Sequence, residues 1–173
     1  MNYRGQQLDF VKYNKEINDI YESIFRDYIK DVFNIDIIKH KVYKHYDFIF
    51  NKIHKIEYKG IYYGIDEKNK IAIKHDDKTK KIDSVYIGVD KITYYYYRQI
   101  RNPSLKFYIY YGFYDINSSN EIYNIKYRYI DISDILKDIM MTYKKCIYLN
   151  KKHFLIPIKD LKKINKNKSL FND

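Results

Sequence analysis

The chain has a single cysteine, five glycines and no apolar run near the length of a membrane span. One thiol, Cys146, excludes an internal disulfide and a cysteine zinc site, and it fits a reducing, cytoplasmic location. The glycines do not cluster, which argues against a phosphate-binding glycine loop. Spanning a bilayer takes about 20 apolar residues, and the polar stretch from Met1 to Asp9 lacks the apolar core of a signal peptide. We therefore expect no membrane segment.

Acidic residues are outnumbered: 22 Asp and Glu stand against 33 Lys and Arg, which gives a net charge of +11. A charge so far from zero attracts polyanions, with nucleic acid the first candidate and an anionic membrane surface the second. The excess of Lys, Ile, Asn and Tyr is also what AT-rich codon usage produces, so the charge has a genomic explanation as well. The 23 tyrosines allow two interpretations in the same way, because tyrosine stacks on bases and is also a good strand former.

The length of 173 residues and the hydrophobic content of 46% fit one domain with a real core. No internal repeat and no linker rich in Gly, Ser or Pro divides the chain. We expect a single domain over residues 1–173, ending in a basic, frayed tail from Lys162 to Asp173.

Hydrophobic periodicity predicts helices and strands in alternation. Helices are expected at about 11–33 and 91–100, from Asp131 or Ser133 to about Tyr143, and briefly from Ile158. Strands are expected within 35–50 and at 53–59, 70–74, 84–89, 106–114, 121–130, 145–149 and 153–156. This order predicts an α/β (α+β) fold with a mixed central β-sheet flanked by helices.

The segment from Tyr46 to Gly60, YDFIFNKIHKIEYKG, carries the most suggestive constellation. Asp47 opens one strand, and Glu57 and Lys59 share a face near the end of the next strand. A three-residue turn over 51–53 places Asp47 directly opposite Glu57 on the same face, whereas a two-residue turn places them on opposite faces. Two close carboxylates favour a Mg²⁺ or Mn²⁺ ion between them, and a nearby lysine could orient an attacking water or stabilise a phosphate.

This segment resembles the core of the PD-(D/E)xK nuclease superfamily, although Tyr46 stands in place of the family's nominal proline. The resemblance implies a restriction-endonuclease-like fold and metal-dependent hydrolysis of phosphodiester bonds, with DNA as a substrate before RNA. It implies that Asp47, Glu57 and Lys59 are catalytic, and that Asp47, Glu57 and a helical Glu22 bind the metal. One active site per chain means that cutting both strands of a duplex requires a homodimer.

Two cationic clusters are candidates for contacting nucleic acid. Arg98 and Arg101 follow the tyrosines of 94–97, as in stacking platforms, and Lys151 and Lys152 begin a basic C-terminal region that could grip phosphates. The sequence favours solvated side chains over metal ligands for His40, His45 and His54.

The pattern acid-x-Lys occurs four times in the chain, so the tripeptide alone is not specific. The purely structural alternative for the acidic pair is a solvent-facing hairpin whose lysine neutralises two carboxylates. At the level of function, the alternatives are a non-catalytic basic module that binds nucleic acid or acts as a phage-type inhibitor, and a structural protein whose charge follows codon usage.

Overall fold

The computed structural model describes residues 3–40, 45–62, 64–65, 71–75, 78–81, 84–116, 122–133, 135–136, 138–148 and 150–171. The chain forms two compact units, Met1–Ile37 and Ile38–Asp173. The expectation of a single domain stays a prediction.

The first unit consists of one long helix, α1 (Tyr3–Phe33), which begins earlier than the sequence predicted. Tyr21, Phe25 and Ile29 are buried and recur every four residues, as an amphipathic helix requires. Asn34 ends the helix with a φ of 54°, a left-handed conformation typical of the residue that follows a helix.

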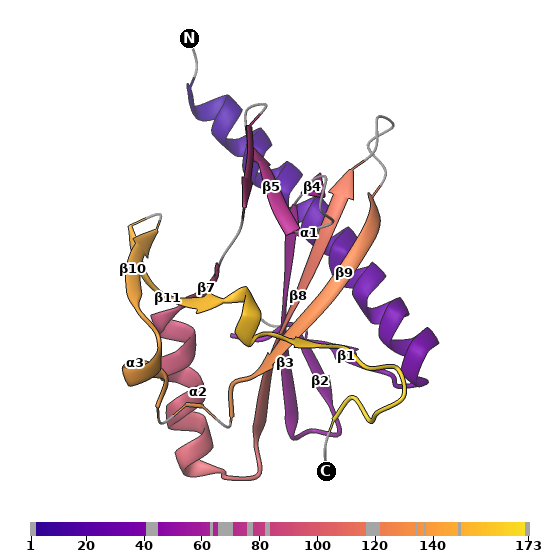
Figure 1. The fold of residues 1–173 in the computed structure, drawn as a ribbon, viewed down its shortest axis with the longest axis vertical. Coiled ribbons are helices and arrows are strands. Elements are labelled where there is room, and N and C mark those ends of the chain that lie inside the picture. The colour runs from indigo at the N-terminus through magenta and orange to yellow at the C-terminus, as the bar shows by residue number, and fades with distance from the viewer. Residues whose placement is uncertain are drawn as a thin grey trace. The chain divides into compact units, whose positions relative to one another are not determined.

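The second unit is built on a six-stranded sheet in the order β1-β2-β3-β8-β9-β12 (Figure 1). Strands β3 and β8 are parallel and the other neighbours are antiparallel, so the predicted mixed central sheet is confirmed. Its strands are β1 (Ile38–Lys39), β2 (Phe48–Phe50), β3 (His54–Tyr62), β8 (Lys106–Ile116), β9 (Ile122–Asp131) and β12 (Lys162–Lys163).

Two three-stranded sheets accompany the main sheet. One has the order β10-β11-β7, from β10 (Lys145–Tyr148), β11 (Lys151–Pro157) and β7 (Ser84–Gly88). The other has the order β4-β5-β6, from β4 (Gly64–Ile65), β5 (Ile71–His75) and β6 (Lys78–Lys81). A short 3₁₀ helix, Ile158–Asp160, follows β11. The strands predicted at 145–149 and 153–156 are confirmed as the antiparallel pair β10 and β11, and β11 also includes Lys151 and Lys152.

Helix α2 (Val89–Arg101) contains the run of four tyrosines and confirms the helical prediction for that stretch. Ile92 and Tyr95 are buried three positions apart, which is a helical and not a strand period. They pack in one hydrophobic core with Phe107, Ile109 and Tyr111 of β8. Helix α2 therefore covers the face of the main sheet that these β8 residues occupy. No helix in the described ranges is long and apolar enough to cross a membrane.

The helix predicted from Asp131 or Ser133 to Tyr143 is wrong over most of its length. Strand β9 continues to Asp131, and the helix here is only α3 (Ile139–Thr142). Asp131 Oδ1 accepts a hydrogen bond from the Ser133 amide at 3.0 Å, and Ser133 Oγ accepts one from the Phe107 amide at 2.6 Å. The two side chains thus build a turn at the strand end, a local alternative that Asp and Ser offer to a helix start.

The C-terminal segment differs from the frayed tail that the sequence predicted. Strand β12 pairs with β9, and Phe171 is only 3% exposed. The Phe171 ring lies 4.8 Å from the rings of Phe50 and His54 and 5.5 Å from that of Tyr108. His54 is 1% exposed, so it is a core residue and not the solvated histidine that the sequence favoured.

Candidate functional site

The register of the β2–β3 hairpin decides whether the acidic pair can exist. Phe48 pairs with Ile56, which leaves a three-residue turn over 51–53. The three-residue turn that the metal-site hypothesis requires is therefore confirmed, and it predicts that Asp47, directly before β2, lies opposite Glu57.

Backbone conformation within the turn explains this loop length. Asn51 and Lys52 adopt φ values of 46° and 60°, and the Ile53 amide donates to the Asn51 carbonyl at 2.7 Å. Asparagine enters the left-handed region more readily than most residues. The turn therefore takes three residues and fixes which side chains of β3 face those of β2.

Glu57 is buried, with 4% of its surface exposed. The alternative of a solvent-facing hairpin is therefore wrong. Burial raises the pKa of Tyr95 and Tyr111, two phenols of the core, and the charge of Glu57 raises the pKa of both further. A buried carboxylate needs charged or hydrogen-bonding partners to be stable.

Two lysines supply that charge. Lys91 of α2 donates a short hydrogen bond to Glu57 Oε1, and Lys59 Nζ lies 3.5 Å from the same oxygen. The sequence analysis included Lys59 and missed Lys91. The signal that could have found Lys91 is its place one turn before Tyr95 on the apolar side of a helix, where a charged residue needs a partner.

Asp47 is held by the backbone of the neighbouring strand. Asp47 Oδ2 accepts a hydrogen bond from the Tyr58 amide at 2.8 Å, and the Asp47 amide donates to the Ile56 carbonyl at 2.8 Å. Burial raises the pKa of Tyr95 well above its usual value, and the charges of Glu57 and Asp47 raise it further. The charges of both carboxylates therefore act on the same phenol of α2.

Two buried polar atoms near this pair have no hydrogen-bond partner among the described residues: Glu57 Oε2 and the Tyr111 hydroxyl oxygen. Such groups normally mark a water or an ion. The described ranges hold no cluster of three or more His, Cys, Asp and Glu side chains placed for a metal. A divalent ion here would have two protein carboxylates, and Mg²⁺ sites commonly combine one or two carboxylates with water and phosphate. The residues therefore fit such an ion.

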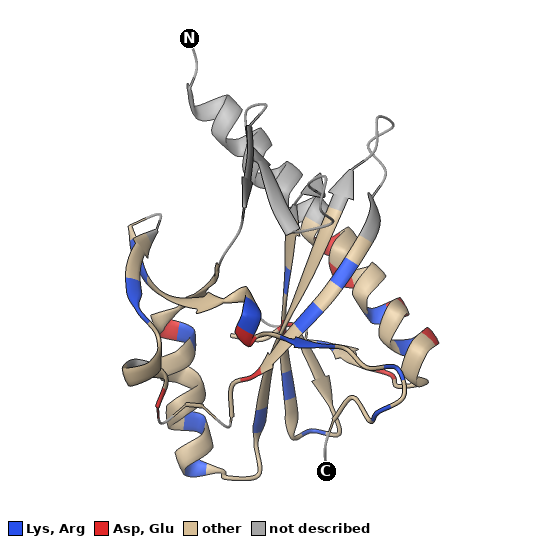
Figure 2. Ribbon diagram, in the orientation of Figure 1, with Lys and Arg blue, Asp and Glu red and all other residues tan. Residues whose placement is uncertain are grey.

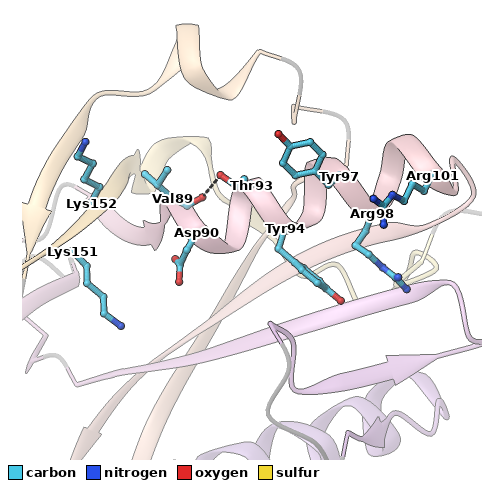
Figure 3. Close-up of a pocket in the computed structure, with 9 residues that line it drawn as sticks. All are labelled: Val89, Asp90, Thr93, Tyr94, Tyr97, Arg98, Arg101, Lys151 and Lys152. Carbon is cyan, nitrogen blue, oxygen red and sulfur yellow. Dashed lines mark hydrogen bonds between the residues drawn. The ribbon is translucent and has the colours of Figure 1, made fainter.

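A groove of about 1070 Å³ runs along α2 (Figure 3). All four predicted nucleic-acid contacts line it: Arg98 and Arg101 from α2, and Lys151 and Lys152 from β11. Val89, Asp90, Thr93, Tyr94 and Tyr97 complete the lining. Four cations against one carboxylate make the groove basic, and Figure 2 shows further Lys and Arg on β9 and β12.

Helix α2, which lines the groove, also contacts the segment that leads into β2. The Tyr94 ring, on the groove side, lies 4.2 Å from the ring of His45, two positions before Asp47. The Tyr95 hydroxyl donates a short hydrogen bond to the His45 carbonyl. Burial raises the pKa of Tyr46, the charge of Tyr94 raises it further and Arg98 lowers it in part.

Glu22 is half-buried on α1, in the first unit. Its assignment as a metal ligand rests on the resemblance and stays a prediction. Cys146 is a thiol without a disulfide partner.

Comparison with known proteins adds little to this geometry. No family model matches the chain, and no curated protein matches it. A solved structure described as a nuclease from a fusselovirus matches over 96% of this chain and 90% of that chain, with 14% identity and a TM-score of 0.35. A TM-score at that level carries no argument, so the interpretation of the site rests on its own residues.

Proposed function

We propose that this protein is a metal-dependent nuclease that hydrolyses phosphodiester bonds of nucleic acid, DNA in preference to RNA. One observation carries the proposal: the Glu57 carboxylate is buried and its Oε2 has no hydrogen-bond partner among the described residues, while Asp47 directly precedes the paired strand β2. The order of elements, α1, then β1 to β3, then four further strands, then α2 and β8 parallel to β3, also supports the PD-(D/E)xK resemblance.

Asp47 and Glu57 would hold a Mg²⁺ or Mn²⁺ ion, with Glu22 as a third ligand by resemblance alone. Such an ion, when bound, supplies Lewis-acid activation of a phosphodiester. Hard oxygen ligands of this kind suit both metals.

The remaining roles fall to residues already in place. Lys59, whose side chain is one-third exposed, would orient the attacking water and stabilise charge that develops on the phosphate. Lys91 would hold the Glu57 carboxylate in place through its hydrogen bond while no metal is bound. The Tyr58 amide fixes Asp47, so that ligand is oriented before any metal arrives. Arg98, Arg101, Lys151 and Lys152 would hold the phosphate backbone in the groove.

The deciding experiment incubates the purified protein with plasmid DNA, single-stranded DNA and RNA, each with Mg²⁺, Mn²⁺ or EDTA. We expect metal-dependent cleavage, lowered about 100-fold or more in Glu57→Gln and Asp47→Asn, the effect of removing one electrostatic contributor to a transition state. The exposed Asp138→Asn is the matched control and should cleave like the wild type. Full activity in a folded Glu57→Gln variant would refute the assignment.

A second function is favoured by one observation. Lys59 and Lys91 already neutralise Glu57 within the protein, as a purely structural charge cluster would. A non-catalytic nucleic-acid-binding or inhibitor protein would then bind DNA or RNA in a salt-dependent way and cut neither.

A further inference from the structure

We infer that the groove along α2 takes a single strand of nucleic acid, with an unpaired base stacked on Tyr97. The inference rests on the proposed function for the class of ligand, and it adds the form of that ligand. Three observations support it: the placement of the cations, the exposed aromatic ring between them and the size of the groove.

The cations stand at the two ends of the groove. His153 pairs with Gly88, which sets Lys151 and Lys152 beside the start of α2, while Arg98 and Arg101 occupy its last turn (Figure 3). Thirteen helical residues span about 20 Å at the usual rise. One strand of a duplex carries a phosphate for about every 3.4 Å of helix axis, so about six phosphates of a stacked strand, or fewer of a more extended one, would join the two ends.

Tyrosine rings lie between those ends. Tyr97 is 60% exposed and lines the groove one turn after Tyr94, whose ring already packs at a tilt against that of His45. In a duplex the base faces are stacked on one another and only base edges reach a protein through the grooves. Only an unpaired base has a face to offer Tyr97, and stacking of this kind is how proteins hold single strands without sequence preference.

The size of the groove agrees with a single strand. Cavities that enclose one drug-sized ligand measure about 300–1,000 Å³, and this groove measures about 1070 Å³. It can hold a short stretch of one strand. A duplex would instead rest on the surface of α2 and leave the Tyr97 ring without a base face.

The test measures binding separately from cleavage, in the Glu57→Gln background with EDTA present. Fluorescence anisotropy compares a labelled thymidylate oligomer of about 20 nucleotides, a uridylate oligomer and a duplex of equal length, over a range of salt concentrations. We expect a single strand to bind at least about tenfold more tightly than the duplex. Tyr97→Ala should weaken that binding by about 5- to 150-fold, the range of one base–aromatic stack, and Tyr97→Phe should retain it.

Tyr86→Ala on β7 is the matched control, because Tyr86 is also exposed and lies outside the groove lining. Equal or tighter binding of the duplex, or unchanged binding in Tyr97→Ala, would overturn the inference. Failure of the proposed nuclease activity looks different: the single strand binds through Tyr97, but wild-type protein with Mg²⁺ or Mn²⁺ cuts nothing. The thymidylate and uridylate arms show whether DNA or RNA supplies the strand.

Discussion

Lys91 on α2 forms an ion pair with Glu57 on β3, whose carboxylate is almost fully buried. Lys59 Nζ reaches the same carboxylate oxygen from 3.5 Å, so two ammonium groups share Oε1 while Oε2 has no partner among the described residues. This ion pair connects α2 to β3, the strand that carries Glu57. Glu57 is therefore both a contact that stabilises the fold and the proposed metal ligand.

Replacing Lys91 should destabilise the fold more than replacing Lys59. Removing one partner of a buried pair costs about 3–5 kcal/mol, and we expect about 2–4 kcal/mol for Lys91→Met because Lys59 remains near Glu57. Lys59 makes the longer contact and is one-third exposed, so Lys59→Met should cost about 1 kcal/mol or less. Urea denaturation of each variant measures the free energy of unfolding.

A double-mutant cycle supplies the control for this prediction. Glu57→Gln removes the charge that needs Lys91, so the Glu57→Gln/Lys91→Met double variant should be less destabilised than the sum of the single variants. Additive losses, or equal losses for Lys91→Met and Lys59→Met, would mean that the ion pair does not stabilise the fold.

The buried tyrosines predict loss of stability in alkali. Burial raises the pKa of Tyr95 well above its usual value near 10, and the carboxylates of Glu57 and Asp47 raise it further. The folded state therefore holds the Tyr95 proton more tightly than the unfolded state. The resulting stability is complete below about pH 10, the unfolded pKa, and is lost as the pH rises towards the folded pKa.

Thermal unfolding measured from about pH 8 to pH 11 tests this expectation. Tyr95→Phe should lower stability at neutral pH by about 1 kcal/mol, because the hydrogen bond to the His45 carbonyl is lost. Its melting temperature should then fall less steeply above pH 10 than that of the wild type, with Tyr111 still contributing to the fall. Parallel alkaline curves for the two proteins would show that Tyr95 does not titrate with unfolding.

The hairpin could be predicted from the sequence because its information is local. Alternation along 53–59 fixed the faces of β3, and the polar pair Asn51–Lys52 marked the turn. The tyrosine run by itself fits a strand or a helix, and the burial of Ile92 and Tyr95 three positions apart in the structure decides for the helix.

Contacts across long stretches of sequence could not be predicted in this way. Lys91 meets Glu57 across 34 positions, and the groove joins the end of α2 to the start of β11. The sequence identified Arg98, Arg101, Lys151 and Lys152 as two separate clusters, but no pattern in it predicted that the two clusters line one groove. Asp131 and Ser133 misled for the opposite reason, because the same hydrogen-bonding side chains that cap helices also build turns at strand ends.

The C-terminal segment should contribute to stability although its composition is that of a solvated tail. Phe171→Ala should cost about 3 kcal/mol, because burial of its ring against Phe50, His54 and Tyr108 is lost. The exposed Lys168→Ala, three positions earlier, should leave the melting temperature unchanged. Chemical denaturation of both variants compares them directly. If Phe171→Ala unfolds like the wild type, the tail does not pack on the sheet in solution.

Metal binding can be tested without any substrate through its effect on stability. A ligand that binds only the folded state stabilises it by about 2.7 kcal/mol at 100 times its dissociation constant, so Mg²⁺ or Mn²⁺ should raise the melting temperature of the wild type. Glu57→Gln and Asp47→Asn should remove this rise, and Asp138→Asn should keep it. Lys91→Met should enlarge it, because the ammonium group that competes for Glu57 is gone. NaCl at matched ionic strength controls for screening. An equal rise in Glu57→Gln would place the ion elsewhere, and no rise in any variant would leave Glu57 as the anionic partner of two lysines and nothing more.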